Sequence, residues 1–322
     1  RRAGDGAMSR LRLLFCGTPQ FAVPSLKHLL AQPEFEVAGV FTQPDRPRGR
    51  GGEISFSAVK EAAQAAGVAV HQPVKIRAPE VEAQLREAAP DAMVIIAYGQ
   101  IIPARLLGIP RLGWINLHAS LLPKYRGAAP IHWAIANGET VSGNTTMRID
   151  AGMDTGDMLL QEELRIGADE TAPELARRLA EAGAPLMAET LRRLAAGTLV
   201  PRGQNHAEAS LAPILKREDG IIVWERTARE IYNRMRGFTP WPGAYTWFRG
   251  QTCHLLGRPV SNEKTEAGAG TLLTHHGGLR VACGQGSLLE LTHVKLEGRK
   301  QVSAVEFANG ARLKAGERFG KG

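Results

Sequence analysis

The chain has 322 residues, 43% of them hydrophobic and 22% charged, and carries a formal net charge of +8 at pH 7. This composition is typical of a soluble globular protein, and the length exceeds one ordinary core, so we expect two domains. No apolar run approaches the roughly 18–20 residues needed to cross a bilayer, which argues against a transmembrane helix. Residues 1–7 lack the apolar core of a signal peptide, and we expect the natural chain to start at Met8.

The three cysteines are Cys16, Cys253 and Cys283, which lie far apart in the sequence. Their odd number argues against a disulfide framework, and their spacing is not that of a metal site. We therefore expect a cytoplasmic protein that binds no metal, with its thiols reduced and buried.

The first hundred residues predict strands that alternate with helices. Expected strands lie at 11–16, 36–42, 67–70 and 91–97, and expected helices at 24–30, 58–66 and 79–89. This alternation implies a Rossmann-like, mostly parallel sheet, and the apolar strands imply that helices cover both faces. The first strand-to-helix turn, 16–20, lacks the G-x-G-x-x-G pattern, so a nicotinamide cofactor is not indicated.

The second half of the chain predicts a different architecture. A long helix is expected at 171–196 and a short one at about 227–236. Five short runs with Gly-containing turns between them predict a small OB-like β-barrel: 244–248, 251–257, 271–275, 279–283 and 287–297. The predicted fold class is therefore α/β, with a catalytic domain at 9–200, a linker at 201–213 and an OB-like domain at 214–317.

The positive charge is concentrated in the last third of the chain. Residues 214–322 contain 17 Lys and Arg against 10 Asp and Glu, a net charge of +7. Residues 1–213 contain 23 against 22, a net charge of +1. A basic module attached to a neutral one suits a polyanion such as RNA, although a basic surface can also serve only solubility.

The expected strand at 114–118 places two polar side chains on one face. Asn116 and His118 share that face, while Ile115 and Leu117 point to the other. An amide and an imidazole side by side can donate hydrogen bonds to an oxygen on which negative charge develops. The alternative is that the pair is merely a polar strand end.

The residues after this strand favour a ligand site. The run Ser120–Pro123 forms an exit loop at the carboxyl edge of the sheet, where open α/β sheets bind ligands. Leu121 and Leu122 would be unusual in an exposed loop unless they pack on something flat and apolar. The strand that ends near Ala97 brings Tyr98 and Gly99 to the same crevice, where the small neighbours of Tyr98 leave room for a ring.

A second polar run, 150–157, lies about one βα unit downstream. Its central carboxylate, Asp154, lies in a Gly-rich bend that can hold it against an imidazole. Asp150 and Asp157 compete for that role, and carboxylates in such turns are often only turn formers. A third feature, the Pro/Gly loop with Arg46, Arg48 and Arg50, suits phosphate recognition or is a solvated basic loop.

With these residues identified, the chain resembles the methionyl-tRNA formyltransferase family of folate-dependent formyltransferases. The resemblance covers about residues 10–317. The motifs that carry it are Phe-Cys-Gly-Thr-Pro at 15–19, Val-Phe-Thr-Gln-Pro-Asp-Arg-Pro at 40–47, Ala-Tyr-Gly at 97–99, Asn-Leu-His-Ala-Ser-Leu-Leu-Pro at 116–123, Arg-Gly-Ala-Ala-Pro-Ile at 126–131, Asp-x-Gly-Met-Asp-Thr-Gly-Asp at 150–157 and Phe-Thr-Pro-Trp-Pro-Gly at 238–243.

The resemblance implies transfer of the formyl group of 10-formyltetrahydrofolate to the α-amino group of methionine on initiator tRNA, for translation initiation. Asn116, His118 and Asp154 match the catalytic residues of the wider family. Three further sets of residues have implied roles: Ser120, Leu121, Leu122 and Pro123 in folate binding, with Gly99 beside them; Arg46, Arg48 and Arg50 in contact with the tRNA acceptor end; and the OB-like domain in tRNA support.

The implied chemistry is acyl transfer through a tetrahedral intermediate. Asn116 and a protonated His118 would stabilise the oxyanion, and Asp154 would hold His118 protonated and help move the amine proton. We expect a monomer that needs no metal. The alternative is a folate-dependent N-formyltransferase for a small amine, such as glycinamide ribonucleotide, or for an amino sugar nucleotide, and the basic loop and basic domain argue against it.

Overall fold

The computed structural model describes residues 10–48, 53–275 and 277–320. The chain divides into two compact units. The N-terminal unit comprises Arg1–Gly127, Val141–Arg165 and Ala176–Ala212, and the C-terminal unit comprises Ala128–Thr140, Ile166–Leu175 and Pro213–Gly322. Among the described helices, none is both long enough and apolar enough to cross a membrane.

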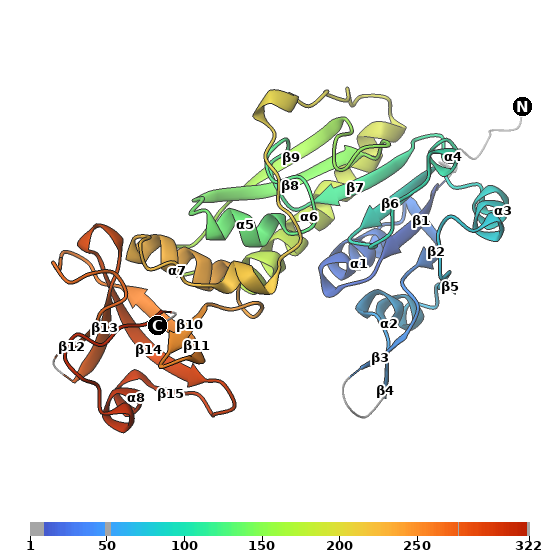
Figure 1. Cartoon of the computed structure of the whole chain (residues 1–322). Helices are drawn as coiled ribbons and strands as arrows, with labels where there is room; N and C mark the ends of the chain where they lie inside the picture. The colour runs from blue at the N-terminus through green and yellow to red at the C-terminus, as the bar shows by residue number, and fades with distance from the viewer. Residues whose placement is uncertain (1–9, 49–52, 276, 321–322) are drawn as a thin grey trace, which may run out of the picture. The chain divides into compact units, whose positions relative to one another are not determined.

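A seven-stranded sheet with the order β5-β2-β1-β6-β7-β8-β9 forms the centre of the N-terminal unit (Figure 1). Its strands are β1 (Leu11–Gly17), β2 (Phe35–Phe41), β5 (Val70–His71), β6 (Ala92–Ile96), β7 (Trp114–His118), β8 (Val141–Arg148) and β9 (Met158–Arg165). The pairs from β5 to β7 are parallel, as the alternation of strands and helices predicts.

Helices cover both faces of this sheet. One face packs against α1 (Val23–Ala31), α2 (Ala58–Ala65) and α6 (Ala172–Ala195), and the other against α3 (Pro79–Ala88) and α4 (Ala104–Leu107). All five residues of β6 are buried, because alternate side chains enter the two apolar layers. The Rossmann-like architecture is therefore confirmed.

The chain changes direction across the sheet at β1. From β1 it winds outward through β2 to β5, and it later returns to β6 and β7 on the opposite side of β1. In such sheets the carboxyl ends of the two central strands form a crevice that binds ligands. The ends of β1 and β6 at Gly17 and Ile96, with the end of β7 at His118, lie at this edge.

The strand β8 interrupts the parallel pattern of the sheet. It runs antiparallel to β7 and pairs with β9 in an antiparallel hairpin. The loop that carries Asp154 is therefore the tip of a hairpin, and one helix, α5 (Pro130–Ala136), and one strand, β8, separate it from β7 along the chain, as the expected spacing of about one βα unit implies. The expected strand at 67–70 lies later, at Val70–His71.

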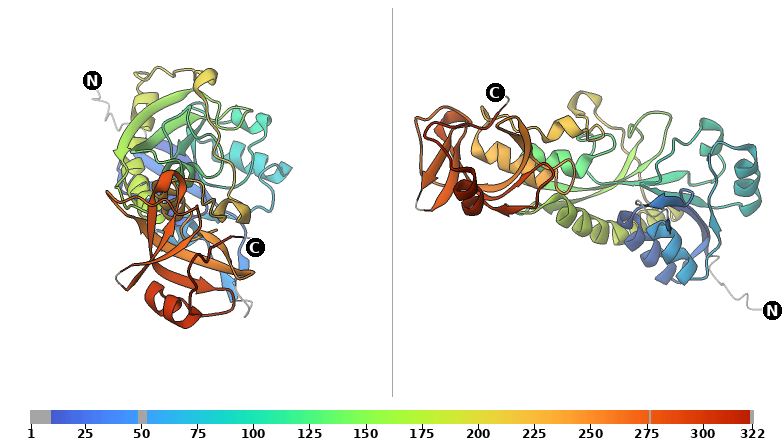
Figure 2. Two further views of the ribbon diagram at one scale, coloured as in Figure 1. Left: turned by 60° about the vertical axis from the view of Figure 1, so that its left-hand side comes forward. Right: turned by 60° about the horizontal axis from the view of Figure 1, so that its bottom comes forward.

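An antiparallel six-stranded sheet dominates the C-terminal unit, with the order β10-β11-β14-β13-β12 and with β15 paired to β14. Its strands are β10 (Tyr245–Phe248), β11 (Gln251–Pro259), β12 (Leu272–His275), β13 (Gly278–Ala282), β14 (Leu288–Leu296) and β15 (Val302–Ser303). Helix α8 (Ala304–Ala311) packs on β13 and β14 and is the dark red helix in Figure 2. These strands confirm the predicted small β domain.

Two further helices belong to the C-terminal unit, α5 (Pro130–Ala136) and α7 (Ala228–Gly237). They pack closely where Gly237 faces α5. A Cβ atom at Gly237 would lie 2.8 Å from both the Ala136 amide nitrogen and the His132 carbonyl oxygen. The segment 166–175 is held to α7 as well, because Arg236 donates to the carbonyls of Gly167 and Glu170.

The short elements lie mainly in connections. A hairpin of β3 (Arg46–Arg48) and β4 (Glu53–Ser55) follows β2. The 3₁₀ turns are η1 (Gln20–Ala22), η2 (His206–Glu208), η3 (Arg217–Gly220) and η4 (Gly284–Gly286). The segment 201–212 carries η2, and isolated bridges pair Arg202 with Met158 and Leu211 with Arg126.

Candidate active site

A cavity of about 520 Å³ opens at the carboxyl ends of β1, β2 and β6. Its walls include Thr18 after β1, Gln43 after β2, and residues 97–99 after β6. Two hydrogen bonds join these walls, because the Tyr98 carbonyl accepts from Thr18 Oγ1 at 3.2 Å and from Gln43 Nε2 at 3.0 Å. The cavity therefore lies where the winding of the sheet predicts it, and Gly99 is on its wall.

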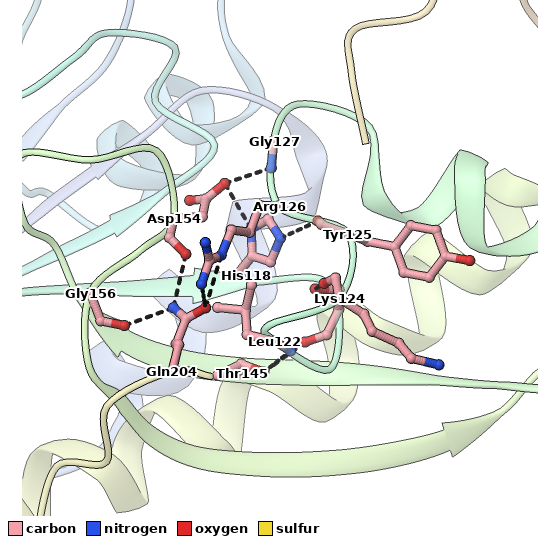
Figure 3. Close-up of polar contacts among 11 residues, drawn as sticks. His118, Leu122, Lys124, Tyr125, Arg126, Gly127, Thr145, Asp154, Gly156 and Gln204 are labelled. Carbon is pink, nitrogen blue, oxygen red and sulfur yellow. Dashed lines mark hydrogen bonds and ion pairs between the residues drawn. The ribbon is translucent and has the colours of Figure 1, made fainter. Parts of the chain in front are cut away.

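His118 ends β7 and is held from both sides (Figure 3). Its Nε2 lies 2.8 Å from the Tyr125 carbonyl oxygen. A carbonyl only accepts, so Nε2 carries the proton. Nδ1 lies 3.7 Å from Asp154 Oδ2, which is an ion-pair distance but longer than a hydrogen bond. Both ring nitrogens thus face oxygen acceptors, an arrangement that accommodates an imidazolium.

Asn116 lies two residues earlier on β7 and is partly exposed, whereas Ile115 and Leu117 are buried in the apolar layer beneath α1 and α6. Asn116 and His118 therefore share the face of the sheet that the alternation predicts. The strand brings an amide and an imidazole to one position beside the β8–β9 hairpin.

The carboxylates in the loop between β8 and β9 have different surroundings. Asp154 adopts a positive φ of 54°, a conformation that Asp tolerates, and its Oδ2 accepts from the Gly127 amide at 2.8 Å. Asp150 Oδ1 accepts instead from the Gly152 amide and the Thr155 hydroxyl of its own loop. Asp157 is exposed. Of the three, Asp154 is the carboxylate that faces His118.

Several groups of the loop Ser120–Pro123 already contact other residues of the protein. Ser120 Oγ donates to the Lys124 carbonyl, and the Leu122 amide donates to Thr145 Oγ1. The Leu122 side chain is buried against Met147 and Met158. Leu121 and Pro123 are partly exposed, so these two residues of the loop remain accessible to a ligand.

A second cavity, of about 140 Å³, lies beside Asp154. Apolar side chains from β6, β8 and the segment after β6 line it: Ile95, Ile102, Met147 and Ile149. The other wall is the loop 150–154, so the cavity offers apolar faces with a carboxylate at one end. This cavity was not predicted from the sequence, because its walls come from three separate segments.

The structure describes two of the three arginines of the basic loop, and only one of them is known to line a cavity. Arg46 begins β3, is exposed and lines the larger cavity. Arg48 ends the same strand. Arg50 lies outside the described residues.

Two buried polar residues beside Asp154 were missed by sequence reasoning. Arg126 donates from Nε and Nη2 to Gln204 Oε1, at 3.0 and 2.7 Å. Gln204 Nε2 in turn donates to the carbonyls of Asp154 and Gly156, both at 2.8 Å (Figure 3). Arg126 belongs to a recognisable motif, but Gln204 lies in a segment without periodicity and gave no signal.

The arrangement can polarise a carbonyl and move a proton. Asn116 and His118 supply donors for a developing oxyanion, and Asp154 supplies an acceptor close to the imidazole. Burial raises the pKa of the Cys16 thiol, as it does for Cys253 and Cys283, which leaves all three cysteines unsuited as nucleophiles. Within the described residues, no group of three His, Cys, Asp or Glu side chains is placed to hold a metal ion.

Comparison with known proteins identifies the class. Residues 10–191 match the family described as Formyl transferase, and residues 214–312 match Formyl transferase, C-terminal domain. The chain therefore belongs to the formyl transferase family, as its motifs predict.

The names of its curated relatives are more specific than the name of the family. The methionyl-tRNA formyltransferase of Acidobacterium capsulatum is 53% identical over 311 residues, which cover 96% of this chain and 100% of the relative. The methionyl-tRNA formyltransferase of Solibacter usitatus is 53% identical over 313 residues, covering 97% and 99%. A solved N-formyltransferase from Helicobacter canadensis shares the fold, with a TM-score of 0.64 at 21% identity over 87% of this chain and 98% of that one.

Proposed function

We propose that this enzyme transfers the formyl group of 10-formyltetrahydrofolate to the α-amino group of methionine on initiator methionyl-tRNA. The observation that carries the proposal is the pairing of His118 with Asp154 beside Asn116, in a chain that is 53% identical to methionyl-tRNA formyltransferases over nearly its whole length. The geometry of this pair suits acyl transfer, and we infer the substrates from the names of the relatives.

Asn116 and His118 stabilise the tetrahedral intermediate of this transfer. The neutral amine of methionine attacks the formyl carbon, and the formyl oxygen becomes an oxyanion. The oxyanion then collapses, the bond between the formyl carbon and N10 breaks, and N10 takes up the proton that the amine has lost, so that tetrahydrofolate leaves. The Asn116 amide and the His118 imidazolium donate hydrogen bonds to the oxyanion, at the end of a rigid strand where the donors are preorganised. The hydrogen bond from Nε2–H to the Tyr125 carbonyl supports this role, because it leaves Nδ1 as the ring nitrogen that can donate to the oxyanion.

Asp154 faces Nδ1 of His118 and receives the proton that the attacking amine must lose, directly or through water, before that proton passes to N10. Support comes from the Nδ1–Oδ2 distance of 3.7 Å, which leaves both groups free to contact one incoming amine. The Gly127 amide holds Asp154 in that orientation.

We assign the folate ring to the apolar cavity beside Asp154, and we assign Leu121 and Pro123, the partly exposed residues of the 120–123 loop, to contact with the folate. Apolar walls from Ile95, Ile102 and Met147 suit a flat ring. Gly99, which lines the larger cavity at the end of β6, is proposed to contact the folate from that side.

The aminoacyl end of the tRNA enters the larger cavity, where Arg46 lines the wall. Arg48 and Arg50, which follow Arg46 in the sequence, are proposed to contact the same end of the tRNA. The net charge of +7 in residues 214–322 supports contact of that domain with the tRNA. Along the sequence, the proposed catalytic domain is 9–200 and the proposed tRNA-binding domain is 214–317, with 201–213 as the linker, and the compact unit that contains 214–317 also includes 128–140 and 166–175. We also propose that the enzyme works as a monomer in the cytoplasm, consistent with three free cysteines.

A panel of acceptors tests the proposal. The purified protein is given 10-formyltetrahydrofolate and, in parallel, initiator methionyl-tRNA, elongator methionyl-tRNA, glycinamide ribonucleotide and an amino sugar nucleotide. We expect formyl transfer with kcat/KM highest for initiator methionyl-tRNA and no turnover of the two small amines. Preferred turnover of either small amine would replace the tRNA assignment with the alternative function.

A further inference from the structure

Gln204 is a buried polar side chain with every hydrogen-bonding group in use. It is 8% exposed, and Arg126 beside it is 7% exposed. The oxygen of Gln204 accepts two bonds from Arg126, and its nitrogen donates to the carbonyls of Asp154 and Gly156. A buried, fully satisfied network of this kind fixes the geometry of the groups that it joins.

The groups joined by this network are the two partners of His118. Tyr125 supplies the carbonyl that accepts from His118 Nε2. Gly127 supplies the amide that donates to Asp154 Oδ2. Arg126 lies between these two residues, so one tripeptide sets the position of the imidazole and of the carboxylate (Figure 3).

The tripeptide is itself held by the segment that precedes Pro213. The Arg126 amide donates to the Ser210 carbonyl at 2.9 Å, and the Ala212 amide donates to the Arg126 carbonyl at 2.7 Å. Ser210 Oγ accepts from the Tyr125 amide at 2.9 Å. Gly127 has φ +116°, and a Cβ atom there would lie 2.8 Å from the Ala212 carbonyl oxygen, so the close pairing requires glycine.

We infer that Gln204, within the segment 201–212, is a positioning residue for the Asp154–His118 pair, in addition to the connecting role of that segment. It ties the hairpin tip at Asp154 to the tripeptide through Arg126, and it thereby fixes the 3.7 Å separation of carboxylate and imidazole. The inference rests on the proposed function, because its assay is formyl transfer to methionyl-tRNA.

The chemistry of a glutamine is specific here. It presents one oxygen to a guanidinium and one amide nitrogen to two carbonyls, and no other side chain of this length does both. In Gln204→Glu the bonds from Arg126 remain, but a carboxylate replaces the donor and faces two carbonyl oxygens. In Gln204→Ala both sets of bonds disappear.

The test compares Gln204→Ala, Gln204→Glu and a matched control, Asn205→Ala. Asn205 is the next residue, is exposed, and bonds only within η2. We expect kcat to fall roughly 10- to 100-fold in both Gln204 variants, because small displacements of catalytic groups are costly, while KM for both substrates changes less than about threefold. Asn205→Ala should match the wild type.

A double-mutant cycle with Asp154→Asn separates positioning from general damage. If Gln204 acts through Asp154, Gln204→Ala should add little to the loss already caused by Asp154→Asn. Full additivity, or a loss confined to KM, would overturn the inference. Should Gln204→Ala fail to fold, Gln204→Glu decides by the same criteria. Absence of wild-type turnover on methionyl-tRNA would instead count against the proposed function.

Discussion

His118 shows how a strand end becomes a reactive position. Its Nε2 proton is donated to the Tyr125 carbonyl, so this hydrogen bond occupies one of the two ring nitrogens. Nδ1 is left facing Asp154, and the ring is buried, with 6% of its surface exposed. A buried imidazole flanked by a carboxylate is suited to carrying a proton.

Asp154→Asn tests the carboxylate at this scale. The amide keeps an oxygen for the Gly127 donor but removes the negative charge beside His118. We expect kcat to fall about 10²- to 10⁴-fold, with little change in KM.

Asp157→Asn is the control, because Asp157 is exposed in the same loop. Steady-state formylation kinetics on both variants provide the measurement. Equal losses in the two would show that the loop needs charge in general and would remove the special role of Asp154.

At the scale of elements, the reversal of winding at β1 decides where the large cavity opens. The large cavity lies over the ends of β1, β2 and β6, and strand β7, which carries Asn116 and His118, is the next neighbour of β6. The β3–β4 hairpin, inserted after β2, carries Arg46 to the wall of that cavity. A guanidinium at this position suits the phosphates of an RNA end.

Replacement of Arg46 by Ala tests the hairpin as an RNA contact. We expect weaker methionyl-tRNA binding, with the slope of log Kd against log salt reduced by about 1, and an unchanged kcat at saturation. Filter binding over a range of salt concentrations measures this. Arg86→Ala is the control, because Arg86 is exposed on α3 and pairs with Glu82. The same slope in wild type and Arg46→Ala would assign the hairpin to the solvated surface.

The elements were predictable where one segment determines its own structure. The strand at β6 and the helix α2 have apolar patterns of the right period, and Ser57 caps α2 by accepting from the Lys60 amide. The antiparallel direction of β8 was not predictable, because direction depends on which edge of the sheet a strand joins. Only the tertiary structure decides that, and it also places Asp154 at a hairpin tip.

At the scale of the whole molecule, the sequence shows that positive charge is concentrated in the last third of the chain. It did not predict which earlier segments belong to the C-terminal unit. The C-terminal unit includes 128–140 and 166–175, and α5 packs against α7 within it. Removal of residues 214–322 would therefore strip α7 from α5 and damage more than RNA binding. Point variants are the better test of the division of labour.

The candidate site was likewise predictable only where one segment determines the arrangement of its residues. Asn116 and His118 are two residues apart on one strand, so their common face could be predicted from alternation. Gln204 is 50 residues from Asp154 in sequence, and its role follows from the fold alone. The sequence therefore identified the groups proposed to do the chemistry, whereas the groups that position them required the structure.

The account separates chemistry, centred on His118, from binding, distributed over Arg46 and the basic C-terminal domain. The most direct test is single-turnover formyl transfer to initiator methionyl-tRNA by the wild type and by His118→Ala, with tRNA affinity measured in parallel. We expect the transfer rate to fall at least about 10²-fold while the Kd for tRNA stays within about twofold. An unchanged transfer rate in His118→Ala would contradict the account.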